Sequence, residues 1–581
     1  MDPSFKRTPR VPIETIPGTL PIASVSEDVD HAGVAAEGLK MLTSLTRENL
    51  TKESIWRDQW ALTGTSRTFS GPSQVFAAWK ELAATRKPDN FSLIPNTSRI
   101  TASLPDSAWV QASFAFTLEG APACLCSGFI GLVPDNAGGW KIWMLSTILE
   151  TFKGYPNPDT PPPQPSASTH TNGVNGFSDE YSYDCVVVGG GMAGLSVAGR
   201  LKAMNVSSVT LERNAHIGDN WLMRYDSTKS HLPFSRTFSA EDGYFLTSSK
   251  IAQGFQRYVK TYGINVWGSS DLKTASWNAQ KKLWNLQVER QNPSCTVIIN
   301  TPHVVLCLGA GGQVSKMPTI PNREAFGGIV MHSKDYKSSN AWSGKNGVVV
   351  GSANTAHDVA FDMVESHLRT VTMIQRNPTA LYNDFIPVEV ADKIYFGLPL
   401  SISRQILLKV IRNEVDKHSE RYDSLERAGF KLDRYCDPQE YISVRLGGHH
   451  IDVGAGKKIT SGQIKMKSDA AIKQYTPTGL EFADGSHLDV DVIVFCTGFE
   501  GNMRESATEI FGSEVANGLE DFFGVDAEGE ILGAWRRQGY PGIWYNGGTI
   551  VNARYYSRFI ALQIKADLEG MPLPLYKKTP A

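Results

Sequence analysis

A short apolar run followed at once by a glycine-rich turn constrains this chain most. Residues 183–188 (YDCVVV) have the composition of a buried parallel strand, and residues 195–204 have the apolar spacing of a helix. Between them lie Gly189, Gly191 and Gly194 in the order G-x-G-x-x-G. In a βαβ unit the first glycine permits a tight turn, the second lets a pyrophosphate approach the backbone, and the third lets helix and strand pack closely. The segment therefore predicts a dinucleotide-binding fold.

The second strand of this unit, residues 209–211, ends at Glu212, which stands 18 positions after Gly194. A carboxylate there would accept hydrogen bonds from a ribose hydroxyl and would repel a 2′-phosphate. We therefore expect this site to take FAD or NAD rather than NADP.

A second copy of the unit begins at residue 347. Residues 347–350 (GVVV) and 371–375 have the composition of strands, and residues 355–368 that of a helix. The turn between the first strand and the helix starts with Gly351, but alanine replaces the second and third glycines at Ala353 and Ala356. The third position tolerates alanine, whereas the methyl group of Ala353 lies where a phosphate should approach the backbone.

Arg376 follows the second strand of this copy, 20 positions past Ala356. A guanidinium there can hold a 2′-phosphate through charge-assisted hydrogen bonds, so the site should prefer NADPH to NADH. An exposed surface arginine is the alternative. Two units with these different preferences predict a protein that holds FAD and NADPH together.

The residues before the first unit have another pattern. Residues 28–50 and 72–85 have helical spacing, whereas residues 109–118, 124–133 and 140–149 alternate or run apolar as strands do. This order predicts an α+β domain. In element order it is similar to NTF2-like (SnoaL-like) domains, for which a packing or dimerising role without chemistry is the simpler interpretation.

The predicted fold class is α/β, with two Rossmann-type dinucleotide-binding domains for FAD and NADPH preceded by an α+β NTF2-like domain. The expected segments are 1–153 (N-terminal domain), 154–180 (a linker rich in Pro, Ser, Asn and Gly), 181–335 (FAD-binding, first part), 336–480 (NADPH-binding, with a substrate-covering insertion) and 481–581 (FAD-binding, C-terminal part).

Composition excludes several classes of function. With 57 Lys and Arg against 59 Asp and Glu, the formal charge of -2 gives no electrostatic reason to expect nucleic acid as a partner. No run approaches the roughly 18 apolar residues of a membrane helix, and the N-terminus lacks a signal-peptide core, so we expect a cytoplasmic protein. Seven cysteines without a C-x-x-C pair argue against a disulfide reductase, and no His/Cys spacing predicts a metal site.

Residues 326–336 (FGGIVMHSKDY) match the F-x-G-x-x-x-H-x-x-x-[YW] string of the class B flavin-dependent monooxygenases. This family includes flavin-containing monooxygenases, plant YUCCA-type enzymes and Baeyer–Villiger relatives. Residues 218–225 (GDNWLMRY), 494–499 (VFCTGF) and 552–558 (NARYYSR) are also similar to family segments. The chain resembles the family over about residues 181–568, and most resembles a fungal or microbial branch with an NTF2-like extension.

The resemblance implies that NADPH reduces FAD, that O2 then gives a C4a-(hydro)peroxyflavin, and that one oxygen atom enters a small organic substrate, in secondary metabolism. Nitrogen or sulfur oxygenation and ketone or 2-oxo acid oxygenation both remain open. An NADPH oxidase that releases hydrogen peroxide is one alternative. A non-catalytic binding protein with a vestigial flavin site is another, suggested by Ala353. A homodimer is also left open.

The resemblance also assigns roles to single residues. His332 is a candidate for proton transfer or for tying the nucleotide domains together, and Asn354 is a candidate for contacting the cofactors or for capping the following helix. Trp221 is a candidate for packing against FAD, and the helix that begins near residue 552 would aim its positive end at the flavin. His449 and His450 neighbour glycines and are expected at a polar surface. The predicted cofactor contacts are Gly189, Gly191, Met192, Ala193, Gly194, Glu212, Arg213, Asn220, Trp221, Arg224, His231, Gly351, Ser352, Ala353, Asn354, Thr355, Arg376, Thr497 and Gly498.

Overall fold

A computed structural model describes the chain at residues 5–104, 107–162, 180–222, 227–228, 231–234, 237–239, 241–242, 245–291, 293–309, 314–382, 396–452 and 454–580. Most of the predicted linker, residues 163–179, lies outside these ranges. The mixed α/β class with two Rossmann-like units is confirmed, because two five-stranded sheets of parallel strands each carry a strand–turn–helix unit.

The N-terminal residues form a seven-stranded sheet, here called the front sheet, in the order β2-β1-β7-β6-β5-β3 with β4 paired to β5. Its strands are β1 (Leu50–Gln59), β2 (Ser66–Ser70), β3 (Pro88–Leu93), β4 (Arg99–Leu104), β5 (Ser107–Leu118), β6 (Cys124–Pro134) and β7 (Trp140–Phe152). Helices α1 (His31–Thr43) and α2 (Pro72–Arg86) pack on it. The predicted helix through residue 50 is wrong beyond Thr43, because Thr46 and Asn49 form a capping box that starts a short 3-10 turn.

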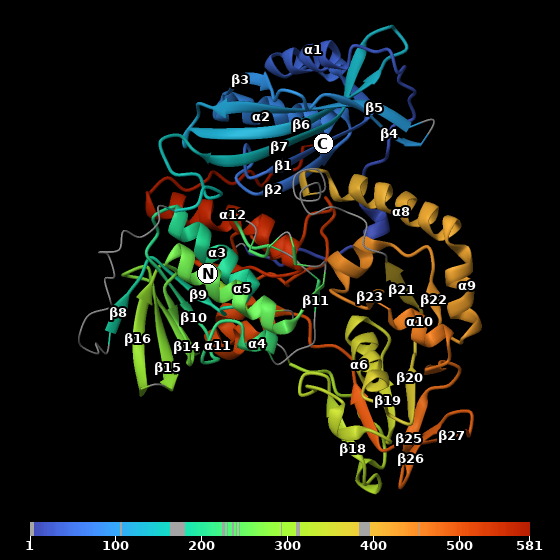
Figure 1. The fold of residues 1–581 in the computed structure, drawn as a ribbon. Coiled ribbons are helices and arrows are strands. Elements are labelled where there is room, and N and C mark those ends of the chain that lie inside the picture. The colour runs from blue at the N-terminus through green and yellow to red at the C-terminus, as the bar shows by residue number, and fades with distance from the viewer. Residues whose placement is uncertain are drawn as a thin grey trace.

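The first nucleotide sheet has the strand order β13-β10-β9-β17-β29. Its strands are β13 (Val266–Trp267), β10 (Ser208–Leu211), β9 (Cys185–Val188), β17 (His303–Leu306) and β29 (Ile543–Tyr545). Helix α3 (Met192–Ala203) connects β9 to β10, as the glycine turn predicts. Helix α12 (Ile550–Leu568) packs on α3 and lies between this sheet and the front sheet (Figure 1).

The second nucleotide sheet has the strand order β18-β28-β19-β20-β24. Its strands are β18 (Ile329–His332), β28 (Val492–Phe495), β19 (Asn346–Val350), β20 (Thr370–Ile374) and β24 (Ile464–Lys467), and helix α6 (Asn354–Glu365) connects β19 to β20. Strand β18 precedes residue 336 and β28 follows residue 480, yet both pair within this sheet.

Smaller elements complete the chain. Further helices are α4 (Asp219–Leu222), α5 (Ser248–Tyr262), α8 (Leu400–Lys417), α9 (Ser419–Arg427), the π-helix η7 (Glu440–Val444), α10 (Ala455–Thr460) and α11 (Met503–Asn517). Further strands are β8 (Glu180–Ser182), β14 (Ser270–Asn278), β15 (Leu283–Gln291), β16 (Ser294–Thr301), β11 (Ser227–Thr228), β12 (Phe245–Leu246), β21 (Thr379–Tyr382), β22 (Leu432–Asp433), β23 (His449–Ile451), β25 (Ile472–Thr476), β26 (Gly479–Phe482) and β27 (His487–Asp489). Within the described ranges, no helix combines the length and apolarity that crossing a bilayer requires.

One continuous apolar core joins the front sheet, the first nucleotide sheet and α12. Trp60, which directly follows β1 of the front sheet, stacks on Phe559 of α12 with ring centroids 4.3 Å apart. Near the C-terminus, Tyr576 donates its backbone N–H to the carbonyl of Thr63 in the connection between β1 and β2. The front sheet is therefore packed directly onto the first nucleotide unit (Figure 1).

Candidate functional site

The first glycine turn has the geometry that each glycine position predicts. Gly189 has a φ of +108°, and a Cβ there would lie 2.5 Å from the carbonyl oxygen of Cys307. A Cβ on Gly194 would lie 1.8 Å from the carbonyl oxygen of Gly189, so helix α3 approaches the turn closely. In contrast, the nearest atom to a Cβ on Gly191 is Nδ2 of Asn220 at 3.8 Å. The second glycine therefore borders open space where a phosphate can approach the backbone.

Glu212 stands directly after β10 and faces this turn. Its carboxylate accepts hydrogen bonds from the backbone N–H of Gly190 at 2.8 Å and from the backbone and side chain of Asn214 at 2.9 and 2.7 Å. The side chain is 8% exposed. An acceptor held at the open end of a Rossmann strand fits an unphosphorylated ribose.

The other predicted contacts of the first unit lie around the same turn. Met192 and Ala193 open α3, and the carbonyl of Ala193 accepts a hydrogen bond from Asn546 at 2.9 Å. Asn220 and Trp221 lie on α4, and the Trp221 ring packs edge-on to Phe255. Arg213 is exposed, His231 accepts at its carbonyl from Arg554 at 3.0 Å, and Arg224 lies outside the described residues.

The second turn repeats the geometry of the first. Gly351 has a φ of +129°, and a Cβ there would lie 2.5 Å from the carbonyl oxygen of Cys496. Cys496 follows β28 as Cys307 follows β17. The N–H of Gly351 donates to the carbonyl of Ile374, as Gly189 donates to Leu211. The two units are therefore structural copies down to single hydrogen bonds.

The residues that follow Gly351 begin α6. Ala353 is the residue that precedes the helix, with a φ of -92°, and Asn354 and Thr355 are its first residues. The hydroxyl groups of Ser352 and Thr379 lie 2.6 Å apart. The N-terminus of α6 thus faces the same edge of its sheet as that of α3, where a helix end favours phosphate.

The copies differ where they would meet the ribose. The backbone N–H of Glu212 donates to Trp267 and that of Gln375 to Lys467, each at 2.9 Å, so Gln375 is the counterpart of Glu212. The Gln375 amide is buried and bonds Thr379 and Lys431. Arg376 is the next residue and is exposed. The second unit therefore places an uncharged side chain where the first has a carboxylate, with a cation beside it.

His332 joins two segments of the second unit. Its Nδ1 accepts from the backbone N–H of Lys334 at 3.1 Å, so Nε2 carries the proton and donates to the carbonyl of Gly498, also at 3.1 Å. Burial lowers the pKa of His332, against the opposing effect of the Gly498 hydrogen bond. Thr497 donates through its hydroxyl to the carbonyl of Lys316. These contacts connect segments within one unit, so the role of His332 in tying the two nucleotide domains together stays a prediction.

Asn354 makes a contact that the sequence did not predict. Its Oδ1 accepts the backbone N–H of Ile451 at 2.7 Å and lies 3.3 Å from Nδ1 of His450. The helix cap is Ala353, which makes no side-chain bond, so the capping role for Asn354 is wrong. The surface position expected for His450 is also wrong: the ring is 1% exposed and stacks on His357, with centroids 3.5 Å apart.

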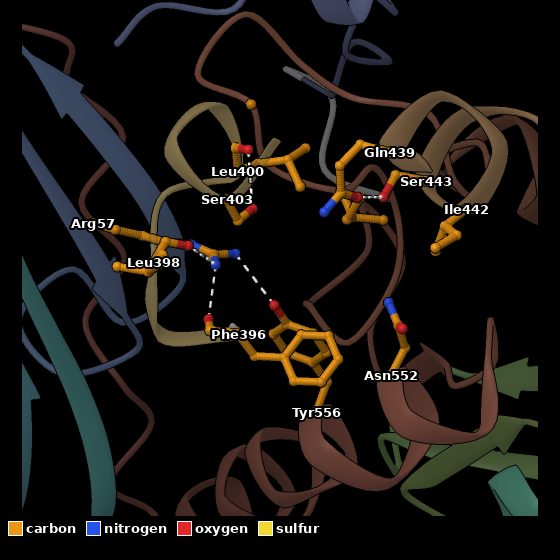
Figure 2. Close-up of a pocket in the computed structure, with 12 residues that line it drawn as sticks. Arg57, Phe396, Leu398, Leu400, Ser403, Gln439, Ile442, Ser443, Asn552 and Tyr556 are labelled. Atoms are coloured by element: carbon orange, nitrogen blue, oxygen red, sulfur yellow. Dashed lines mark hydrogen bonds between the residues drawn. The ribbon is translucent and has the colours of Figure 1, made fainter. Parts of the chain in front are cut away.

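A pocket that the sequence did not reveal lies at the start of α12 (Figure 2). Residues of the front sheet, of segment 396–403, of the π-helix η7 and of α12 line it. These segments are hundreds of positions apart in the chain, so no local pattern marks the pocket. Within the described ranges, no cluster of three or more potential metal ligands occurs.

Comparison with known proteins agrees with this geometry. Residues 183–394 match the family described as pyridine nucleotide-disulphide oxidoreductase. The "Probable indole-3-pyruvate monooxygenase YUCCA8" of Arabidopsis thaliana is 28% identical over 327 residues, which are 55% of this chain and 75% of the relative. The "Indole-3-pyruvate monooxygenase YUCCA8" of Oryza sativa subsp. indica is 24% identical over 404 residues, which are 66% and 90% of the two chains.

Among solved structures, the polycyclic ketone monooxygenase of the fungus Thermothelomyces thermophila shares the fold. The TM-score is 0.51 at 16% identity, over 68% of this chain and 77% of that chain. Two parallel nucleotide sheets with copied glycine turns are the architecture of a protein with two dinucleotide-binding units. The chain is similar to proteins that are named as flavin-dependent monooxygenases and to a family of pyridine nucleotide oxidoreductases.

Proposed function

We propose that the first nucleotide unit binds FAD, that the second binds NADPH, and that the enzyme inserts one atom of O2 into a small organic substrate. The observation that carries the proposal is the pair of copied turns that differ at the ribose position. The first copy has Glu212 there, and the second has Gln375 followed by Arg376. The difference suits one nucleotide without and one with a 2′-phosphate.

The residues present fit both groups. In the first unit, the open face of Gly191 and the N-terminus of α3 would receive the pyrophosphate, and Glu212 would bind the ribose. In the second unit, the N-terminus of α6 would receive the pyrophosphate and Arg376 the 2′-phosphate. Ala353 has an extended backbone and no positive φ, so alanine is accommodated there without backbone strain, although its methyl group narrows the approach of the phosphate.

When bound, FAD accepts electrons from NADPH, activates O2 and supplies the oxygen atom that is transferred. The protein contributes position and exclusion of water. Helix α12 would direct its N-terminal end at the flavin and stabilise negative charge on it, and Thr549 orders that end by accepting the N–H of Asn552 at 3.2 Å. His332 would hold the second unit in place through Gly498.

Several finer statements belong to this proposal. They are the division at residues 153 and 180, the NTF2-like nature of the front sheet, membership of a fungal or microbial branch, a role in secondary metabolism, a cytoplasmic location and a homodimer. The boundaries at residues 335 and 480 do not follow the sheets, because β18 and β28 pair within the second one. The two relatives are named for indole-3-pyruvate and the fungal structure for polycyclic ketones. We therefore propose that a carbonyl compound is oxygenated, and keep nitrogen and sulfur oxygenation as alternatives.

Stoichiometry tests the proposal. We expect one oxygenated product for each NADPH consumed, with little hydrogen peroxide. Peroxide equal to NADPH, without any product across a panel of ketones, amines and sulfides, would instead identify an oxidase. Purified protein that is colourless and does not retain added FAD would identify a binding protein with a vestigial flavin site.

A further inference from the structure

One face of the front sheet buries polar side chains. Arg57 and Gln59 lie two positions apart on β1, and Ser146 of β7 pairs with Arg57, so the three side chains leave the sheet on the same face. They are 4%, 0% and 0% exposed. Burying a polar group is costly unless it is hydrogen-bonded, so this face needs partners from another part of the chain.

The partners are the three consecutive backbone carbonyls of segment 396–398. Nη1 of Arg57 donates to the first and third of them at 2.9 and 2.8 Å, and Nε2 of Gln59 donates to the first at 2.7 Å. The hydroxyl of Ser146 donates to the middle carbonyl at 2.7 Å. Every carbonyl of this segment is therefore held by a buried side chain of the front sheet.

Gln59 also connects this segment to α12. Its Oε1 accepts the hydroxyl of Tyr555 at 2.8 Å while its Nε2 holds Phe396, so both ends of one buried amide are occupied. The Phe396 ring stacks on Tyr555 with centroids 5.0 Å apart and meets Tyr556 edge-on at 5.5 Å. Arg57 reaches the hydroxyl of Tyr556 at 3.4 Å (Figure 2). The front sheet, segment 396–398 and α12 therefore meet in one continuous contact.

The front sheet contacts the following turn of α12 as well. Glu150 of β7 forms an ion pair with Arg558, and Trp60, directly after β1, stacks on Phe559 with centroids 4.3 Å apart. These contacts fall in the second and third turns of a helix that begins at Ile550. The front sheet therefore fixes the half of α12 that begins beside the first nucleotide unit.

The start of α12 lies at the edge of the first nucleotide sheet where we place the flavin. Strand β29 is parallel to β17 and β9, so α12, which follows β29, begins at the carboxyl ends of the strands, as α3 does. Between β29 and α12, Asn546 donates to the carbonyl of Ala193 at the start of α3, at 2.9 Å. A shift of α12 would therefore move its positive end relative to the first glycine turn.

We propose that the front sheet is a positioning element of the flavin site, in which Arg57, Gln59 and Ser146 set the place of the N-terminal end of α12. The inference rests on the proposed function and goes beyond it, because it gives the N-terminal residues a part in the chemistry of the flavin. The three side chains act through Phe396 and Tyr555 and not by touching the cofactor. A positive helix end favours the negatively charged reduced flavin over the oxidised one, so the reduction potential reports the position of α12.

The reduction potential of the bound flavin tests the inference. Wild-type holoenzyme and Gln59→Leu would be reduced anaerobically beside a dye of known potential. We expect the variant to bind reduced flavin about three- to tenfold more weakly relative to oxidised flavin, which lowers a two-electron potential by about 15 to 30 mV. The wild-type potential in Gln59→Leu overturns the inference. If that variant does not fold, Tyr555→Phe, which removes only the hydroxyl bound to Gln59, decides in the same way.

Thr147 supplies the matched control. It follows Ser146 on β7 and points to the opposite face, where its buried hydroxyl donates to Asp58 at 2.5 Å. Thr147→Val should lower the free energy of unfolding, because it removes a partner of a buried carboxylate, but should keep the wild-type flavin potential. A shift in Thr147→Val as large as in Gln59→Leu would trace the effect to lost stability and would overturn the inference.

The double variant of Gln59→Leu and Tyr555→Phe tests the route of the effect. It should shift the potential no further than Gln59→Leu alone, because both substitutions break the same contact. Additive shifts would show that the two residues act separately and would contradict the route through Gln59. Wild-type protein that binds no flavin would reject the proposed function itself, whereas bound flavin with the same potential in every variant rejects only this inference.

Discussion

The carboxylate of Glu212 accepts the backbone N–H of Gly190 at 2.8 Å, so the acidic residue after β10 also fixes the turn that follows β9. Glu212→Ala should therefore weaken FAD binding by about 10- to 150-fold, the range for loss of a charge-assisted hydrogen bond. The ratio of flavin to protein absorbance after gel filtration measures this. Glu289→Ala, on an exposed side chain of β15, is the control. If Glu212→Ala retains as much flavin as the control, Glu212 does not contribute to FAD binding.

Two neighbouring glycines should respond in opposite ways to substitution. A Cβ on Gly191 meets nothing nearer than 3.8 Å, so Gly191→Val should keep the fold and lose flavin. A Cβ on Gly194 would lie 1.8 Å from the carbonyl of Gly189, so even Gly194→Ala should lower the free energy of unfolding by about 1–3 kcal/mol or more. Circular dichroism melts and flavin content separate the two effects. A Gly191→Val protein that retains flavin would show that the first turn does not bind it.

The buried pair Arg57 and Glu530 should show strong energetic interaction. Although burial opposes it, Arg57 lowers the pKa of Glu530 below its usual value. Arg57→Met or Glu530→Leu alone should cost about 3–5 kcal/mol, since each leaves an uncompensated buried charge, and the double variant should cost less than the sum. Urea unfolding of the four proteins measures this. The exposed pair Arg427 and Glu420 is the control, where no significant effect is expected. If the double variant loses as much free energy of unfolding as the two single variants together, Arg57 and Glu530 do not stabilise each other.

Buried histidines predict a loss of stability in acid. Burial lowers the pKa of His303 to about 3, and burial followed by His450 lowers that of His449 to about 4. Both pKa values lie below the value of about 6.5 in the unfolded chain. Above that pH the two histidines are neutral in both states, and their full contribution to the free energy of unfolding is present. This contribution is lost progressively as pH falls toward the folded values. Burial raises the pKa of Asp526 to about 6. Protonation of Asp526 as pH falls therefore stabilises the fold and offsets part of the stability lost at the histidines.

The urea midpoint should therefore fall between about pH 7.5 and pH 5, and fall less in His303→Gln than in the wild type. The exposed His418→Gln is the matched control, which should follow the wild type. A midpoint that does not change over this range, or a His303→Gln protein with the wild-type dependence, would show that burial of His303 does not govern acid stability.

Local patterns predicted the nucleotide units because each is encoded within a short stretch. The strand, glycine turn and helix at residues 183–204 need only their own periodicity, and β9, α3 and β10 formed where expected. The same holds for β19, α6 and β20. In the second copy, the spacing placed the counterpart of Glu212 at Arg376, one residue too late. Only the strand pairing shows that Gln375 is the residue that matches Glu212.

Long-range partners explain what local patterns missed. Strand β1 reads LTKESIWRDQ, and Arg57, Asp58 and Gln59 have the composition of a solvated loop. All three are buried, because their partners come from distant segments such as Glu530 and Phe396. His450 is buried for the same reason, as His357 of α6 stacks on it. The pocket at α12 depends entirely on such contacts.

The anaerobic reduction of bound flavin tests most directly whether the two units hold FAD and NADPH and pass electrons between them. The rate of flavin bleaching would be measured with NADPH and NADH in the wild type, in Arg376→Ala and in the exposed control Arg369→Ala. We predict bleaching by NADPH in preference to NADH, and a loss of that preference by about 10- to 150-fold in Arg376→Ala alone. Flavin that stays oxidised, or nucleotide preference that is the same in all three proteins, would contradict the account.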